Sequence, residues 1–291
     1  MKKTAIAPSN IAFVKYWGQT DPILRLPTNN SISMNLSDLT TTTTVEFSDN
    51  YLEDSIEING ETDGKKIMRA LAHIDKIRAL AKITTRIKMV SVNNFPTGTG
   101  LSSSASGFAA LTVAAAHAAG LSMSEKELSC LARVASGSAC RSIPGGFVEW
   151  EKGMSESTSY AKTLFSPSHW DIVDIVVCLD SSEKYIPTSN AQYCALTSPF
   201  FKTRLQFIDK KIALCKQYIA QKNFDSFGLL VENEALELHA IMMTSSPSLL
   251  YLYPKTVALM RRIQEWREGG VKVYFTLNTG HNVHVLCERH Q

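Results

Sequence analysis

The residues with the clearest chemical potential in this sequence form the small-residue run at positions 94–110, NFPTGTGLSSSASGFAA. The β-branched residues at 83–92 before it predict a strand, and the alanines that follow predict a helix. A helix start presents unpaired backbone N–H groups and the positive end of the helix dipole, which together favour a bound phosphate. The run therefore predicts a phosphate-binding loop. An ordinary capped helix start is the alternative.

Individual residues of this loop suit that role. Gly98 and Gly100 let the backbone approach a ligand closely. The hydroxyls of Ser102, Ser103 and Ser104 can bond phosphate oxygens or a cation.

Three further segments combine polar side chains with glycine. Residues 8–18 place Asn10, Lys15 and Tyr16 in an apolar run, for which an edge strand with a solvated lysine is the alternative. Residues 136–150 place Arg141 among small residues. A planar guanidinium suits a carboxylate, although such an arginine can also satisfy loop carbonyls. The third segment is the Asn-Thr-Gly-His-Asn turn at 278–282.

Strands and helices that could position these residues follow from residue type and spacing. Strands are predicted at 40–47, 83–92, 171–179, 271–277 and 282–287. Helices are predicted at 65–82, from the serine-rich loop to Gly120, from the Ser124–Glu127 capping box towards Gly137, and at 201–219, 224–243 and 255–267. The chain is therefore expected to be mixed α and β, with a domain boundary near residue 180.

Composition excludes several classes of function. The chain has 291 residues, 44% hydrophobic and 20% charged, with a net charge of +3 too dispersed for nucleic-acid binding. No apolar run reaches membrane-spanning length, and the first residues do not predict a signal peptide. The six cysteines are scattered without a CxxC pair, which favours free thiols in a reducing, cytoplasmic compartment.

Taken together, these segments resemble the diphosphomevalonate decarboxylases of the GHMP kinase superfamily, over nearly the whole chain. APSNIAFVKYWG is similar to the family's NIAxxKYWGK, and LPTNNSISMNLSDLTTTTTV to its LPTNSSLSxxL…TTT. NNFPTGTGLSSSASGFAAL resembles NNFPTAAGLASSASGFAAL, and ASGSACRSIPGGFVEW resembles ASGSACRSxxGGFVEW. NEALELHAIMMTSSPSLLYL matches NExxxxHAxxxxxxPxxxYL.

The resemblance implies a fold and a reaction. The expected α+β GHMP kinase fold has an N-terminal ribosomal-S5-like α/β lobe at 1–180 and a C-terminal ferredoxin-like α+β lobe at 181–291. The active site would lie in the cleft between them. The family's enzymes use ATP and Mg²⁺ to phosphorylate the 3-hydroxyl of 5-diphosphomevalonate. Phosphate and CO₂ then leave, giving isopentenyl diphosphate. The resemblance also implies a homodimer.

The same resemblance assigns roles to individual residues. Arg141 would orient the carboxylate and act in catalysis with Lys15. Asn10, Tyr16 and Ser138 would contact the substrate. The nucleotide would be bound by Pro96, Gly98, Gly100, Leu101, Ser102, Ser103 and Ser104, with Ser104 also a ligand of Mg²⁺.

The chain departs from the family pattern at functional positions. Asn278 stands where the family's FxxDAGPN motif has its candidate general base, and an amide cannot take up a proton. Loss of a positioned base costs about a hundred- to ten-thousand-fold in rate. Gln19 replaces the lysine that closes KYWGK, which removes a cation expected near the diphosphate. The family's SSTxGM-type segment has no clear counterpart at 181–198, and the C-terminal elements are expected to be shortened.

Two alternatives to the decarboxylase therefore stay open. One keeps the fold and changes the reaction, to a mevalonate 3-kinase or to the decarboxylase of another phosphorylated mevalonate. The other is a non-catalytic paralogue that binds nucleotide or metabolite. His281 or His284 could be a substitute base, but a turn position and a strand position explain them better, and His239 is expected to be structural or near the site.

Overall fold

The structure is a computed structural model that describes residues 1–98, 100–180 and 191–289. Its larger sheet has six strands: β1 (Lys2–Val14), β4 (Ser31–Ser48), β5 (Ser55–Ile58), β6 (Arg86–Asn93), β7 (Phe147–Trp150) and β8 (Ala161–Phe165). The strand order is β5-β6-β4-β7-β8, and β1 pairs with β4. The short strands β2 (Gln19–Asp21) and β3 (Leu26–Pro27) form a separate pair.

The central strand β4 is longer than its sequence pattern predicts. The predicted strand at 40–47 is the second half of β4, where buried and half-buried residues alternate. The first half begins with four buried residues in succession, because both faces of the sheet are covered there. A strand covered on both faces carries no period-two pattern, so the sequence does not reveal it.

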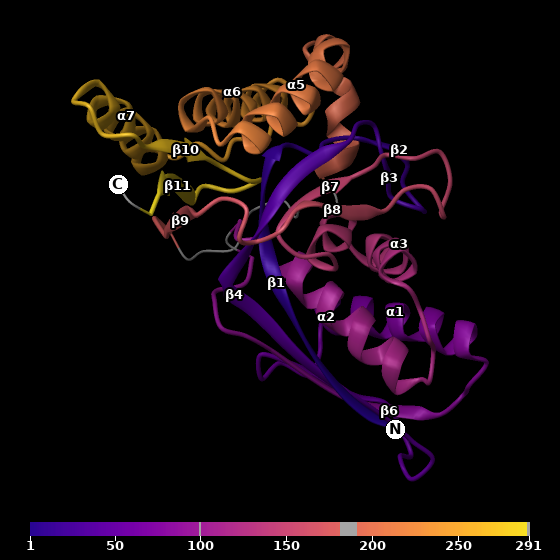
Figure 1. The fold of residues 1–291 in the computed structure, drawn as a ribbon. Helices are drawn as coiled ribbons and strands as arrows, with labels where there is room; N and C mark the ends of the chain where they lie inside the picture. Colours follow the sequence, from indigo (N-terminus) through magenta and orange to yellow (C-terminus); the bar gives the residue numbers. More distant parts are fainter. Residues whose placement is uncertain (99, 181–190, 290–291) are drawn as a thin grey trace.

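Three helices cover one face of this sheet (Figure 1): α1 (Lys65–Ala81), α2 (Ser103–Ala118) and α3 (Glu125–Ala135). Helix α2 packs against both β1 and β4, and its buried alanines permit this close approach. Helix α3 begins at the predicted capping box, since the Ser124 side chain accepts from the Glu127 N–H and Glu127 accepts from the Ser124 N–H. A 3-10 helix, η1 (Gly137–Ser142), leads from α3 to β7.

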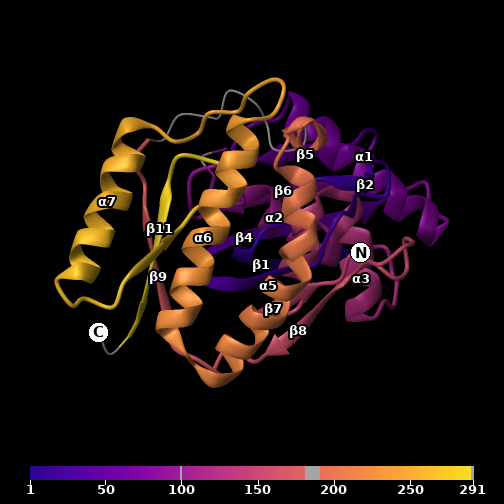
Figure 2. The same ribbon diagram turned by 90° about the horizontal axis from the view of Figure 1, so that it is seen from above.

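The second part of the chain has a three-stranded sheet in the order β10-β11-β9. Its strands are β9 (Ile172–Val177), β10 (Tyr274–Thr276) and β11 (Val283–Glu288). Helices α5 (Phe201–Gln221), α6 (Phe224–Met243) and α7 (Pro254–Glu268) lie beside it (Figure 2), and the 3-10 helix η2 (Gln192–Thr197) precedes them. Helix α5 buries one face at helical spacing, with Phe201, Ile208, Ile212, Cys215 and Ile219 turned inward, as expected for an amphipathic helix. Strand β9 joins the C-terminal sheet, and the boundary near residue 180 stays a prediction.

The two parts share one hydrophobic core. Residues of β1, β4 and β7 on the sheet face opposite α1 and α2 pack against α5 and α6. The Phe13 ring of β1, for example, meets the Phe227 ring of α6 edge-on at 4.8 Å between centroids. The end of β1 therefore lies at the junction of the two parts. The mixed α+β class expected from the sequence is confirmed.

Packing between α6 and β10 generates a stability prediction. A Cβ added at Gly228 would lie 2.1 Å from the Tyr274 ring, whereas one added at Gly107 on α2 would meet nothing within 4 Å. We expect Gly228→Ala to lower the free energy of unfolding by about 1–3 kcal/mol through overpacking. Gly107→Ala should be neutral or stabilising by up to about 1 kcal/mol, because alanine favours a helix. Chemical denaturation of both variants measures the difference, and equal midpoints would contradict the packing argument.

Candidate active site

A cavity of about 620 Å³ lies where the two parts meet. It is lined by the serine-rich loop, the end of β1, α1, η1, and the turn between β10 and β11. Six basic side chains line it, and no aspartate or glutamate of the described residues does. The basic residues are Lys15, Arg25, Lys65, Lys66, Arg69 and Arg141. A concave site with charges of one sign attracts a ligand with several negative charges.

The predicted phosphate loop opens into this cavity at the start of α2. Gly98 and Gly100 have φ angles of 77° and 96°, a region that favours glycine. Ser102 stands at the helix N-cap with φ 58°, and no side chain caps the helix there. The first turn also holds no acidic residue. The positive end of the helix dipole therefore faces the cavity without a protein anion.

The turn that carries Asn278 contacts this loop directly. A Cβ added at Gly100 would lie 3.2 Å from the Gly280 Cα, so the two backbones touch. The Asn278 amide donates to the Ser102 Oγ at 3.0 Å, across 176 positions of sequence. Both residues line the cavity. The position where the family resemblance expects a base therefore lies beside the phosphate loop.

Lys15 is buried, which excludes the solvated edge-strand alternative. Its Nζ donates to the Ala12 carbonyl and, at 2.7 Å, to the Thr276 Oγ1, and the side chain lines the cavity. Burial lowers the pKa of Lys15 to about 7, and the charge of Arg141 acts in the same direction against that of Glu234.

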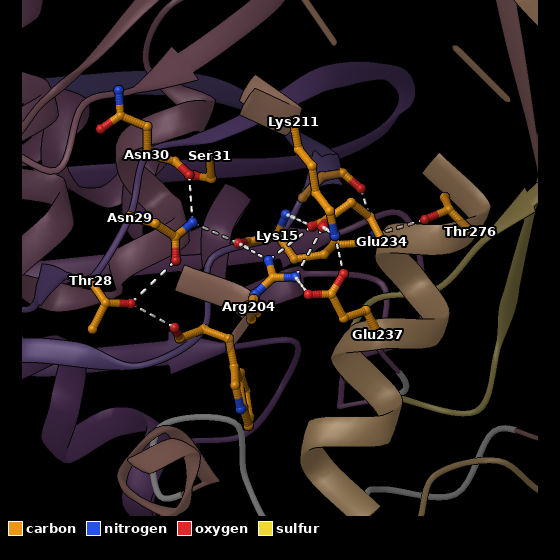
Figure 3. Close-up of polar contacts among 12 residues, drawn as sticks. Lys15, Thr28, Asn29, Asn30, Ser31, Arg204, Lys211, Glu234, Glu237 and Thr276 are labelled. Carbon is orange, nitrogen blue, oxygen red and sulfur yellow. Dashed lines mark hydrogen bonds and ion pairs between the residues drawn. The ribbon is translucent and has the colours of Figure 1, made fainter. Parts of the chain in front are cut away.

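A buried ionic network holds the Lys15 backbone (Figure 3). The Lys15 N–H donates to the Glu234 Oε2 at 3.1 Å, and the Lys15 carbonyl accepts from Arg204 Nη2 and Asn29 Nδ2, each at 3.0 Å. Arg204 also binds both Glu234 oxygens, at 3.0 and 2.9 Å, and Lys211 donates to Glu234 at 2.8 Å. Burial opposes ionisation of Glu234, but Arg204 and Lys211 hold its pKa at about 2.

Arg141, on η1, is held by neutral acceptors. Its Nη1 donates to the Ser31 Oγ at 2.8 Å, and its Nε and Nη2 donate to the Asn10 Oδ1 at 3.3 and 3.2 Å. Asn10 in turn donates to the Ser142 Oγ at 2.8 Å and to the Ser138 carbonyl at 3.3 Å. Among the described residues, no carboxylate pairs with Arg141, so its charge is available to a ligand.

Tyr16 forms the wall beside Arg141. Its ring lies edge-on to Trp150 with centroids 4.5 Å apart, and a Cβ at Gly137 would collide with it. The Gln19 amide donates to the Tyr16 hydroxyl. Burial raises the pKa of Tyr16 to about 12, so the phenol stays neutral.

The structure brings most of the predicted site residues together. Those that line the cavity are Lys15, Tyr16, Gly98, Gly100, Ser102, Ser103, Ser104, Ser138, Arg141 and Asn278. Asn10, Pro96 and Leu101 are not among the lining residues. Asn10 positions Arg141, Pro96 is exposed, and Leu101 is buried with its carbonyl accepting from the Ser9 hydroxyl at 2.6 Å.

Two segments of the predicted site are only partly among the described residues. Thr99 of the loop and residues 181–190 of the segment compared with SSTxGM are outside the described residues. Gln192, just after that gap, lines the cavity and accepts from the Gly18 N–H at 2.7 Å.

Four lining cations were not singled out from the sequence. Lys65, Lys66 and Arg69 lie on the first turns of α1, and their clustering could have indicated a basic helix start. No sequence pattern indicated Arg25, because it reaches the cavity only through the path of the β2–β3 connection in the folded chain.

Neither His281 nor His284, the two histidines considered as a substitute base, lines the cavity, and His239 does not line it either. His239 is buried and donates from Nε2 to the Asn278 carbonyl at 3.1 Å, and burial lowers its pKa to about 4. His281 stacks on Tyr253 with ring centroids 4.8 Å apart. His284 lies in β11, as expected for a strand residue, and its Nδ1 contacts Asp174 at 2.7 Å. These histidines therefore support the turn and the sheet.

Comparisons with known proteins agree with this geometry. Residues 7–161 match the family model described as the diphosphomevalonate decarboxylase-like N-terminal domain, and residues 173–291 match that of the mevalonate 5-diphosphate decarboxylase C-terminal domain. The chain belongs to the diphosphomevalonate decarboxylase family. The diphosphomevalonate decarboxylase of Debaryomyces hansenii is 36% identical over 307 residues, covering 98% of this chain and 79% of that protein.

Solved structures of the family also match. The mevalonate diphosphate decarboxylase of Staphylococcus aureus is 39% identical with a TM-score of 0.93, covering 100% of this chain and 89% of that one. A structure of MDDEF in complex with MVAPP, AMPPCP and magnesium is 35% identical with a TM-score of 0.94, covering 100% and 90%. The GHMP kinase fold expected from the resemblance is confirmed.

Two features are absent from the described residues. No helix there combines the length and apolarity needed to cross a membrane. No group of three or more His, Cys, Asp or Glu side chains could hold a metal ion in that part of the chain.

The Glu234 network generates a prediction for stability and its pH dependence. Glu234→Gln leaves Arg204 and Lys211 with only the half-buried Glu237 as counter-charge. We therefore expect a loss of about 3 kcal/mol in the free energy of unfolding. The pKa of Glu234 falls from 4.5 to about 2 on folding, so its contribution is present above pH 4.5 and lost as the pH falls toward 2.

Denaturation measured from pH 6 down to about 2.5 tests this, and wild type should lose stability more steeply than Glu234→Gln. Glu265→Gln is the matched control, because Glu265 forms an exposed pair with Arg262 worth about 0–1 kcal/mol. If both variants lost the same free energy of unfolding, the buried pair would contribute no more to stability than the exposed pair, which would contradict this prediction.

Proposed function

We propose that this protein catalyses the ATP-dependent decarboxylation of 5-diphosphomevalonate to isopentenyl diphosphate. The observation that carries the proposal is a cavity at a helix N-terminus with no described carboxylate and six cations, one of which is the buried Arg141. Such a cavity suits two phosphorylated ligands, one of which also has a carboxylate. Its relatives are named diphosphomevalonate decarboxylases, and a structure of MDDEF holds MVAPP, AMPPCP and magnesium.

The loop at the start of α2 is the proposed nucleotide site. Its backbone at Gly98 and Gly100 and the hydroxyls of Ser102 and Ser103 would hold the phosphates, while Pro96 and Leu101 shape the loop. The lining has hydroxyls but no carboxylate, which fits a Mg²⁺ ion that enters with the nucleotide and keeps phosphate oxygens and water as ligands. Ser104 would add a protein oxygen. The bound ion would neutralise charge on the transferred phosphoryl group.

Arg141 is the proposed anchor for the substrate carboxylate. Asn10 and Ser31 fix its guanidinium plane through neutral oxygens, so its positive charge is not neutralised within the protein. Ser138 and the neutral hydroxyl of Tyr16 lie on the same wall and would contact the other polar groups of the substrate. This arrangement orients the carboxylate for departure as CO₂.

Lys15 and Asn278 are the residues proposed to act on the hydroxyl that receives the phosphoryl group. Bound anions raise the pKa of a lysine, so Lys15 would be charged in the complex and would stabilise the transferring group. Asn278 can orient the hydroxyl by a hydrogen bond but cannot take its proton. Phosphoryl transfer through a loose transition state depends mainly on positioning and charge stabilisation, which these residues retain.

The comparisons do not favour the kinase or the non-catalytic alternative, because the relatives carry the decarboxylase name. We also propose a homodimer in the cytoplasm. The homodimer rests on the family resemblance, and the location on all six cysteines being free, as in a reducing compartment.

A product assay tests the reaction. Purified protein would receive MgATP with mevalonate, its 5-phosphate or its 5-diphosphate, and ADP and CO₂ would be followed separately. We expect equal amounts of ADP and CO₂ from the 5-diphosphate, and none after chelation of Mg²⁺. ADP without CO₂ would indicate a 3-kinase, and no product from any substrate would contradict both enzymatic functions.

A single substitution tests the role of position 278. Asn278→Asp introduces a carboxylate beside Ser102 and should raise kcat by about a hundred-fold or more, because it supplies a proton acceptor. Asn278→Ala is the control, and it should lower kcat by removing the orienting amide. If Asn278→Asp were no faster than wild type, proton removal would not limit this enzyme.

A further inference from the structure

Arg25 is one of four cations of the cavity that have no role in the mechanism above, together with Lys65, Lys66 and Arg69. Arg25 lies in the connection between β2 and β3, and its φ of 50° is in the left-handed region that non-glycine residues adopt only at a cost. Its Nε donates to the Val134 carbonyl at 2.9 Å, in the last turn of α3. This bond fixes the side chain, and the guanidinium lines the cavity. Its two Nη groups donate to no described residue.

A second arginine is held in the same way beside it. The Arg69 Nη2 donates to the Ala135 carbonyl at 3.2 Å, and its Cζ lies 4.9 Å from the centre of the Phe108 ring. The negative end of the α3 dipole thus binds two guanidinium groups through neutral carbonyls. No described carboxylate pairs with either arginine. Partial burial, and secondarily the charge of Arg25, lower the pKa of Arg69.

The surroundings of Arg25 indicate which ligand it meets. Arg25 directly precedes β3, which pairs with β2, and Gln19 of β2 donates to the Tyr16 hydroxyl, so Arg25 lies on the wall assigned to the substrate. The side chain bonded to that hydroxyl is Gln19, which is uncharged. Arg25 therefore supplies positive charge on the Tyr16 side of the cavity.

We propose that Arg25, backed by Arg69, binds the terminal phosphoryl group of the substrate and thereby sets the preference for a diphosphate over less phosphorylated mevalonates. The inference rests on the proposed function in one respect, that the substrate carries phosphate at its 5-position. The two open Nη groups of Arg25 form the fork that pairs with phosphoryl oxygens. A bound anion also removes the repulsion between the two arginines.

Substitution of Arg25 tests the assignment. In Arg25→Gln we expect the KM for 5-diphosphomevalonate to rise about 10- to 100-fold, as for loss of a charge-assisted hydrogen bond. The kcat, the KM for ATP and the affinity for unphosphorylated mevalonate should stay within about twofold of wild type, since these ligands do not reach the fork. Arg25→Lys keeps the charge without the fork and should fall between the two. Arg262→Gln, on the exposed face of α7, is the matched control.

Titration calorimetry with inorganic diphosphate separates this inference from the proposed function, because it needs no turnover. We expect wild type to bind diphosphate at least tenfold more tightly than Arg25→Gln. Equal affinities would overturn the assignment. So would a raised KM for ATP alone, which would place Arg25 at the nucleotide, or an equal loss for all mevalonates, which would reduce it to a structural role. Diphosphate binding through Arg25 without any decarboxylation would overturn the proposed reaction and leave the anion site standing.

Discussion

The buried carboxylate of Glu234 is the interaction on which the rest of the structure depends. It accepts from the Lys15 backbone, from Arg204 and from Lys211, and so connects the end of β1 with α5 and α6. A buried charge is tolerated only when its partners are complete, so the network specifies one arrangement of these elements. That arrangement sets where β1 ends, and with it the direction in which Lys15 enters the cavity.

The cavity itself follows a second constraint, because six cations in one site repel each other in the absence of a ligand. The three arginines of the cavity are fixed by neutral acceptors instead of carboxylates: Asn10 and Ser31 hold Arg141, and the last carbonyls of α3 hold Arg25 and Arg69. These contacts orient the guanidinium groups without neutralising them. Their charge is consequently available to phosphates and carboxylates, and the ligands stabilise the site that binds them.

The turn at Asn278 shows how the same site is suited to positioning more than to proton transfer. Asn278 is held against Ser102 by its side chain and against His239 by its carbonyl, while burial keeps His239 neutral. The cavity lining thus holds fixed donors and cations but no described carboxylate or histidine. Charge stabilisation and orientation are what such a site contributes to phosphoryl transfer.

The sequence by itself determined the helices and the glycine- and serine-rich loop that opens α2, because helical spacing and glycine-rich turns depend on residues close together in the chain. It also singled out Arg141 among small residues. It also carried the family motifs. It did not reveal the first half of β4, where burial on both faces removes the alternation, nor the burial of Lys15 and the place of Arg25. Only the tertiary structure decided these, since they arise from contacts between segments more than a hundred positions apart, such as Arg25 with α3 and Lys15 with Glu234.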